Sequence, residues 1–255
     1  MARKRDVYWL SDAEWEAIQP HLPSGRRGAR RVDDRRVISG IMHMLRSGGR
    51  WKDCPVVYGP YTTIYNRWNR WSRQGVWERI FYALTGSSGV FTGSVDSTHI
   101  KAHRSAAGAK GGPCHHAIGT SRGGRTTKIH ALSDDCGRPV AFVLTPGNAH
   151  DLAGAKALLA IRCPSHKLLA DRAYDAASLR DWLAERGTEP VIPPNPTRKN
   201  PHAYDRDAYR GRNLIERMFC RLKDFRRIAT RYDKRADIFL SAVCIAAAIT
   251  WWTDN

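Results

Sequence analysis

The sequence has few acidic side chains for its length. Its 255 residues include 24 Asp and Glu against 42 Lys and Arg, which gives a formal charge of +18. An excess of this size is unusual for an enzyme of small metabolites and suits a protein that meets a polyanion, most often nucleic acid. A ribosomal-type or simply basic protein is the other interpretation of the charge alone.

Paired cysteines, long apolar runs and nucleotide-binding motifs are also missing. The six cysteines form no CxxC pair, which favours reduced thiols in a cytosol, and the run Cys114-His115-His116 lacks the spaced partner pair of a zinc site. The most apolar stretch, residues 238–252, has about 15 residues, short of the roughly 20 that span a membrane. We expect it to form a buried helix. No signal-peptide pattern, GxGxxG or GxxxxGK[ST] motif is present, so a nucleotide cofactor loses support.

Residues 1–86 have the pattern of several short helices. Ser11 followed by Glu14 predicts a helix start, and apolar residues recur at helical spacing from Val37 to Leu45 and from Ile64 to Trp71. Six arginines lie between Arg26 and Arg36. These features fit an all-α, helix-turn-helix-like DNA-binding domain and, about equally, a plain helical bundle that covers a neighbouring domain.

Residues 87–255 have a different pattern. Three consecutive strands are predicted at 90–100, 125–133 and 139–145, followed by a helix at 151–161, a strand at 167–170, a helix at 176–186 and a strand at 189–192. Two helices, 212–226 and 236–252, complete the order. The sequence therefore predicts an α/β domain whose mixed sheet is flanked by helices, as in the ribonuclease-H-like fold, and not a doubly wound Rossmann fold.

Two aspartates occupy positions where a sheet presents functional groups. Asp96 lies within a strand-like run, where a carboxylate is costly unless it is paired or bound to metal. Asp171 follows directly on a short apolar strand. Ordinary alternatives are an Asp96 satisfied by nearby hydroxyls and an Asp171 that pairs with Arg172 or caps the next helix. Asp175 is equally open as a functional carboxylate or a helix cap.

The helix after Gly211 arranges its polar residues in one stripe. At 100° per residue, with Arg212 at 0°, Lys223 falls near 20°, Glu216 near 40° and Tyr209 near 60°. The apolar residues fall on another face. A solvated face on which Arg212 and Glu216 form an ordinary i,i+4 pair is the simpler explanation of this spacing.

Three gathered carboxylates would suit metal-dependent phosphodiester chemistry. Two divalent ions about 3.5–4 Å apart can stabilise both the attacking oxygen and the leaving oxygen of the reaction. Hard oxygen ligands favour Mg²⁺ or Mn²⁺. The ions would also offset the repulsion among the carboxylates.

The residues Tyr209, Arg212, Glu216 and Lys223 form the pattern Y-x2-R-x3-E-x6-K, which resembles the C-terminal signature of bacterial DDE insertion-sequence transposases. The residues around this pattern, 212–217 and 221–223, resemble the corresponding residues of the IS-five group within the IS-four/IS-five class. The segment 95–98 resembles its first-Asp block and 169–175 its second, while 146–151 resembles a further block whose role the sequence does not explain. The resemblance extends from about Tyr8 to Trp252.

The resemblance implies a DNA transposase. Asp96, Asp171 and Glu216 would be the catalytic residues and the ligands of two Mg²⁺ or Mn²⁺ ions, on a ribonuclease-H-like domain of residues 87–255. Residues 1–86 would bind the terminal inverted repeats of an insertion sequence. The partners would be those repeats and target DNA, on which the protein forms a homodimer or higher oligomer, in the bacterial cytoplasm with the nucleoid and without a membrane.

The resemblance further implies that Tyr209, Arg212 and Lys223 bind DNA near the cut. From Arg198 to Arg235 there are 13 Lys or Arg against 5 Asp or Glu, which favours phosphate contacts. Two other functions fit the same residues: a degenerate transposase that only represses, and a ribonuclease-H-like nuclease that cuts branched DNA without joining ends.

Overall fold

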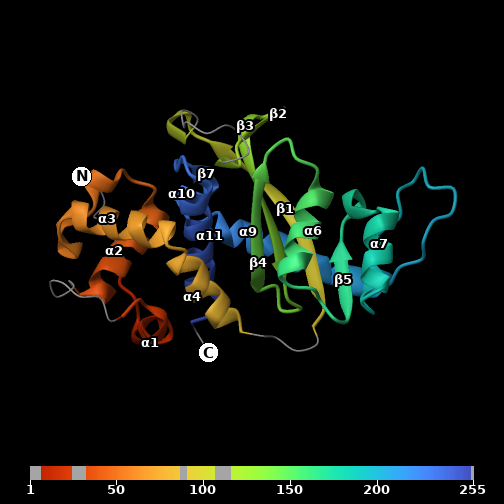
Figure 1. Cartoon of the computed structure of the whole chain (residues 1–255), viewed down its shortest axis with the longest axis horizontal. Helices are drawn as coiled ribbons and strands as arrows, with labels where there is room; N and C mark the ends of the chain where they lie inside the picture. The colour runs from red at the N-terminus through yellow and green to blue at the C-terminus, as the bar shows by residue number, and fades with distance from the viewer. Residues whose placement is uncertain (1–6, 25–32, 87–90, 107–115, 254–255) are drawn as a thin grey trace.

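A computed structural model describes residues 7–24, 33–86, 91–106 and 116–253 of the chain (Figure 1). Four of the six arginines between Arg26 and Arg36 lie outside these residues, as do Cys114 and His115 of the Cys-His run. The described chain consists of a group of helices followed by a seven-stranded mixed sheet with helices on both faces.

The N-terminal part is helical, as predicted. Ser11 caps its first helix: its hydroxyl accepts from the Glu14 amide over 3.1 Å, and the Glu14 carboxylate accepts from the Ser11 amide over 2.7 Å. The second helix ends at Gly48, whose φ of +73° favours glycine. The α-helices in the described residues of this part are α1 (Asp12–Ile18), α2 (Asp34–Ser47), α3 (Tyr61–Arg73) and α4 (Val76–Thr85).

The sheet has the strand order of a ribonuclease-H-like fold. Its strands are β1 (Gly93–Ala102), β2 (Gly119–Ser121), β3 (Gly124–Ser133), β4 (Pro139–Pro146), β5 (Lys167–Ala170), β6 (Glu189–Val191) and β7 (Thr230–Arg231). The main order is β4-β3-β1-β5-β6, antiparallel as far as β1 and parallel from β1 to β6. The two short strands extend it, β2 on β3 and β7 on β1.

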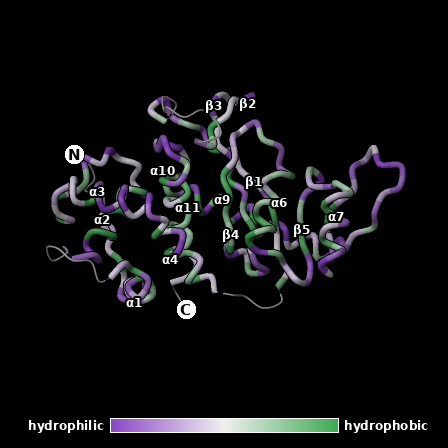
Figure 2. Tube along the Cα trace, in the orientation of Figure 1, coloured by the Kyte–Doolittle hydropathy of each residue, from purple (hydrophilic) through white to green (hydrophobic). Residues whose placement is uncertain are grey.

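Helices cover both faces of this sheet. They are α6 (Asp151–Ile161), α7 (Ala177–Ala184), α8 (Arg206–Tyr209), α9 (Asn213–Leu222), α10 (Arg226–Ala229) and α11 (Ala236–Trp251). Helix α6 packs on β3 and β4, whereas α9 and α11 pack from the other side (Figure 1). Hydrophobic residues are concentrated where these layers meet and hydrophilic ones along the outer turns (Figure 2).

Helix α11 joins the two parts of the chain. It packs on both α4 and β4, and one cluster of buried side chains runs from α2, α3 and α4 through α11 to the sheet. The predicted buried C-terminal helix is thus confirmed. None of the described helices is long and apolar enough to cross a membrane.

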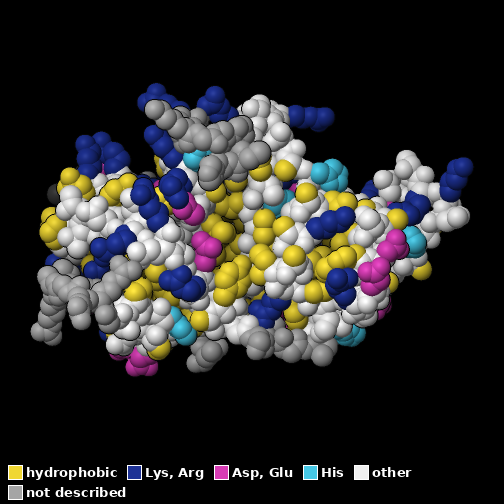
Figure 3. All heavy atoms as spheres, in the orientation of Figure 1, with side chains coloured by type: hydrophobic (Ala, Val, Ile, Leu, Met, Phe, Trp, Pro, Cys, Tyr) yellow, Lys and Arg dark blue, Asp and Glu magenta, His cyan; other side chains and the backbone are white. Residues whose placement is uncertain are grey.

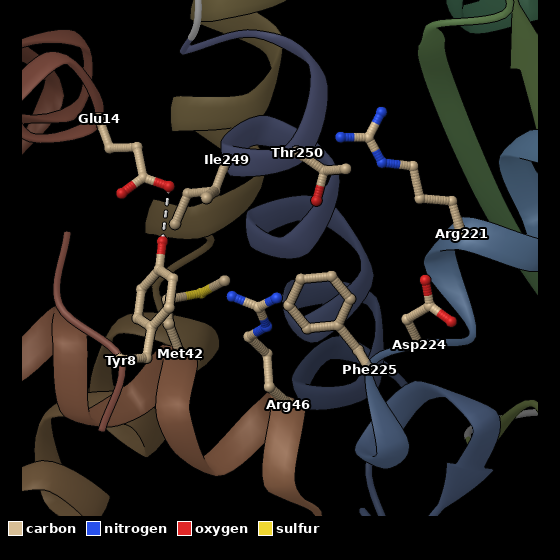
Figure 4. A pocket seen from close by; sticks show the side chains of 9 residues that line it. All are labelled: Tyr8, Glu14, Met42, Arg46, Arg221, Asp224, Phe225, Ile249 and Thr250. Atoms are coloured by element: carbon tan, nitrogen blue, oxygen red, sulfur yellow. Dashed lines mark hydrogen bonds between the residues drawn. The ribbon is translucent and has the colours of Figure 1, made fainter. Parts of the chain in front are cut away.

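A small cavity lies where the N-terminal helices meet the turn after α9 (Figure 4). Its volume is about 190 Å³. The Arg46 guanidinium lies 5.2 Å from the ring centre of Tyr8 and 5.8 Å from that of Phe225. Arg46 therefore connects α2 to the segment that follows α9.

The prediction of one helix over residues 212–226 was wrong at its end. Helix α9 stops at Leu222, Phe225 is extended with φ −76° and ψ 104°, and the separate helix α10 begins at Arg226. Helix α10 packs against α2, where a Cβ added at Gly48 would lie 2.7 Å from the Arg226 Cβ. Close packing on α2 thus accompanies the break. Strands β2 and β7 were not predicted.

Candidate active site

Strand β1 presents side chains to two different layers. Asp96 and Thr98 contact residues of the α9 region, while Ser97 between them contacts Asp151 of α6. This follows from the alternation of side chains along a strand. Asp96, with a side chain 17% exposed, therefore lies on the face that α9 covers.

Asp171 directly follows β5, the parallel strand that neighbours the Asp96 strand β1. In the register of β1 and β5, Val95 pairs with Ala170, so each aspartate is one residue further along. Hydrogen-bonded strands are about 4.8 Å apart, which sets the separation of the two backbones. Asp171 also caps a short 3-10 helix, because its Oδ1 accepts from the Ala173 amide over 2.8 Å. The ordinary capping role is thus present alongside the position next to Asp96.

Arg212 connects Asp96 to Glu216. Its guanidinium donates to Asp96 Oδ2 over 3.0 Å and to Glu216 Oε1 over 2.9 Å. The Arg212 side chain is 14% exposed and that of Glu216 is 58% exposed. The i,i+4 pair expected of a solvated face is present, but Arg212 also reaches β1. Arg212 therefore joins two carboxylates that lie 120 residues apart in the sequence.

Tyr209 and Lys223 lie at the two ends of the predicted stripe. The Arg212 Nε donates to the Tyr209 hydroxyl over 3.4 Å, and the Lys223 ammonium donates to the Thr98 hydroxyl over 2.7 Å. The opposite side of α9 is buried, as the helical angles predicted. Tyr209 belongs to α8 and Lys223 is the C-cap of α9, yet both keep helical backbone angles.

The Asp171 and Glu216 carboxylates act electrostatically on Asp96. Burial raises the pKa of Asp96, and the Asp171 and Glu216 carboxylates raise it further. The Ser97 amide and the Arg212 guanidinium partly oppose this shift. A bound cation would offset the repulsion among these carboxylates.

Carboxylate oxygens alone make up this donor set, so it fits a hard divalent cation such as Mg²⁺ or Mn²⁺. The three acids are not drawn into one tight cluster. Among the described residues, the only ligand atoms that all lie within 4.8 Å belong to Asp134, Asp135 and Cys136. That group is a turn between β3 and β4, in which the Asp134 carboxylate is taken by Arg138.

Asp175 is not the N-cap of α7, and two arginines occupy its carboxylate. Its carboxylate is fully buried and pairs with Arg180 at 2.8 Å and Arg198 at 3.1 Å. It also accepts from the Asn195 amide. The cap of α7 is Ala176. Asp175 instead ties the long segment before α8 to α7.

The sequence did not explain Asp151, at the end of the block 146–151. Its Oδ1 accepts from the Ser97 hydroxyl over 2.7 Å and from the Lys128 ammonium over 3.0 Å. Burial alone would raise the pKa of Asp151, but these two donors hold it below its ordinary value. Asp151 thus fixes β1 directly behind Asp96. The sequence signals for this network were the block 146–151 and Lys128, a basic residue within a predicted strand.

An open hollow borders Glu216 on the outer side of α9. It measures about 620 Å³ and is lined by Asn213, Glu216, Arg217, Cys220, Arg221 and Asp224. Two arginines and the Glu216 carboxylate thus share this open surface.

Two family models match the chain. Residues 10–81 match the model described as "Putative transposase of IS4/5 family", and residues 92–251 match "Transposase DDE domain". The second match covers more than half of the chain. It also spans the whole sheet and the helices α6 to α11.

Relatives with curated names agree. The chain is 38% identical over 127 residues to "Putative transposase for insertion sequence element IS6501" of Brucella ovis, covering 49% of this chain and 98% of the relative. It is 31% identical over 144 residues to "Putative transposase for insertion sequence element IS402" of Burkholderia cepacia, covering 52% and 66%. A pre-cleavage Mos1 transpososome is 13% identical, with a TM-score of 0.26 over 89% of this chain and 80% of that one, and adds nothing to the assignment. The chain therefore belongs to the DDE transposase family of IS4/5-type insertion sequences, and is an enzyme of transposition.

Proposed function

We propose that this transposase cleaves DNA at the ends of an insertion sequence and joins those ends to target DNA, with Asp96, Asp171 and Glu216 as its catalytic carboxylates. The bridge from Arg212 to both Asp96 and Glu216 is the observation that carries the proposal. Through the Arg212 guanidinium, Asp96 of the central strand β1 and Glu216 of helix α9 are connected. Asp171 directly follows strand β5, which pairs with β1 one residue before Asp96.

The same three carboxylates would hold two Mg²⁺ or Mn²⁺ ions. When bound, such ions lower the pKa of an attacking water and stabilise the charge on the leaving oxygen. The protein's own contribution is positional. The sheet fixes Asp96 and Asp171, Asp151 and Lys128 hold β1 from behind, and α9 supplies Glu216 from a more exposed position.

Arg212, Lys223 and Tyr209 would bind the DNA strand at the cut. All three reach the face of β1 that carries Asp96, either directly or through Arg212. A guanidinium can pair with a phosphate through two donors, and an ammonium acts as a point charge. The adjoining hollow, with Arg217 and Arg221, offers a path for the backbone.

The helical residues 1–86 would bind the terminal inverted repeats, and residues 87–255 would form the catalytic domain. Two copies or more would assemble on DNA so that both ends are processed together. The excess of Lys and Arg supports a nucleic-acid partner, and the DNA-binding function assigned to these helices rests on that charge and on the family.

A reconstituted reaction tests this function. Linear duplexes that carry the inverted repeats flanking the gene should be cut in Mg²⁺ or Mn²⁺ to leave 3′-hydroxyl ends, and these ends should join to a target plasmid. EDTA should abolish both steps. Binding without cleavage in any divalent ion would favour a repressor, and cleavage of branched DNA without joining would favour a different nuclease.

A further inference from the structure

One helix of the N-terminal part is open to a partner along a whole stripe. Among the described helices before the sheet, α2 is buried from Val37 to Leu45. Helix α4 exposes little beside Arg79 because it packs on α11. Helix α1 begins with the acidic residues Asp12 and Glu14, which would repel a polyanion. Helix α3 is the one that remains.

The outer stripe of α3 consists of residues whose side chains carry hydrogen-bonding groups. At 100° per residue, five of them fall within an arc of about 100°. They are Thr62, Tyr65, Asn66, Asn69 and Arg73. Four of the five are exposed and Asn69 is half-buried. Unlike a solvated helix face of mixed charge, α3 has no acidic residue from end to end.

The inner side of α3 is held rigidly. Ile64, Trp68 and Trp71 are buried, and the Trp68 and Trp71 rings lie 5.7 and 5.3 Å from the ring of Trp77. Arg67 is 6% exposed and pairs with Asp34 of α2. A helix fixed in this way presents its outer stripe with little freedom, as a surface that reads a partner in detail requires.

We infer that α3 lies in the major groove of duplex DNA and reads base edges through this stripe. The groove, about 12 Å wide, admits one α-helix. In the major groove an asparagine side chain can form two hydrogen bonds with adenine, and an arginine side chain two with guanine. A threonine hydroxyl can bind either a donor or an acceptor on a base edge. This inference rests on the proposed function in that the partner is DNA, and it assigns sequence recognition to one helix.

The charge around α3 suits the same partner. Residues 33–86 include nine Lys or Arg against four Asp or Glu. Arg70 lies just beside the outer stripe and is exposed. Figure 3 shows Lys and Arg side chains spread over the N-terminal helices. These cations can contact phosphates on either side of the groove, while the uncharged amides and hydroxyls of α3 meet the bases.

Selection of binding sites from a random-sequence duplex library, with the full-length protein, tests the inference. The wild type should enrich one motif. Asn66→Ala should lose preference at one or two adjacent base pairs, with affinity for the wild-type motif reduced about 5- to 150-fold, the range of one lost two-bond base contact. Affinity for an unrelated duplex should stay unchanged. Asn66→Gln, which keeps the amide but moves it, should shift the preference at the same positions.

The matched control is Asn200→Ala, an exposed asparagine in the segment before α8. It should select the wild-type motif with wild-type affinity, and thermal unfolding should show all variants folded. If Asn66→Ala also selected that motif with unchanged affinity, the role of α3 would be rejected. A wild type that bound duplexes without enriching any motif would reject recognition by α3 and leave DNA binding standing. A wild type that bound no duplex would reject both.

Discussion

Asp96→Asn should abolish DNA strand cleavage and leave DNA binding intact. The amide keeps the size of the side chain but removes the negative charge that a divalent cation needs. We expect the cleavage rate to fall by at least about three orders of magnitude, the scale seen when one member of a catalytic group is removed. Cleavage of an end-labelled inverted-repeat duplex gives the rate, and a gel shift in EDTA gives the binding.

The same result is expected for Asp171→Asn and Glu216→Gln. The three effects should not add in combination, because the acids act as one unit. Asp181→Asn, an exposed carboxylate on α7, is the control and should cleave at the wild-type rate. Undiminished cleavage by any of the three variants would remove that residue from the catalytic group.

Arg212→Gln should produce the second-largest effect, and one that does not depend on cleavage. Without the guanidinium, Asp96 and Glu216 lose the cation between them. Leaving a buried charged group without its partner costs about 1–3 kcal/mol, and the exposure of Glu216 places the loss toward the lower end. The variant should therefore unfold at a lower temperature in metal-free buffer at neutral pH.

Added Mn²⁺ should then stabilise Arg212→Gln more than the wild type, because the cation no longer competes with a guanidinium for the two carboxylates. Arg217→Gln is the matched control, since it removes the same charge from the exposed side of α9. It should resemble the wild type in both measurements. An equal gain from Mn²⁺ in all three proteins would indicate that Arg212 does not share its carboxylates with a cation.

The helix face was the part of the site that local physics could predict. A period of 100° per residue placed Arg212, Glu216 and Lys223 on one stripe. In the structure Arg212 and Lys223 contact β1, and Glu216 pairs with Arg212. The spacing did not show that Arg212 also binds Asp96, 116 residues away, because pairing across the fold depends on the sheet. Asp96 and Asp171 depended on the family resemblance for the same reason.

Non-local packing also explains what the sequence concealed in the fold. Strands β1 and β3 to β6 correspond to stretches that the sequence predicted as strands. Strands β2 and β7 have three and two residues, too few for a period, and form only because β3 and β1 offer them an edge. The break after Leu222 has no glycine or proline to mark it and coincides with the packing of α10 on α2.

The division at residue 86 remains a prediction. The change of pattern from helical spacing to strands is local and visible in the sequence. The cluster of buried side chains that runs from α2 through α11 to the sheet cannot be seen in the sequence. It means that the helices proposed to bind DNA and the sheet that carries Asp96 would move as closely packed neighbours.

Titration with Mn²⁺, followed by electron paramagnetic resonance of the free ion, tests the central claim most directly. The wild type should bind Mn²⁺ at a site that is lost or strongly weakened in each of Asp96→Asn, Asp171→Asn and Glu216→Gln, and that is unchanged in Asp181→Asn. Equal numbers of sites with equal affinities in all five proteins would contradict the account, because the three carboxylates would then not form one metal site.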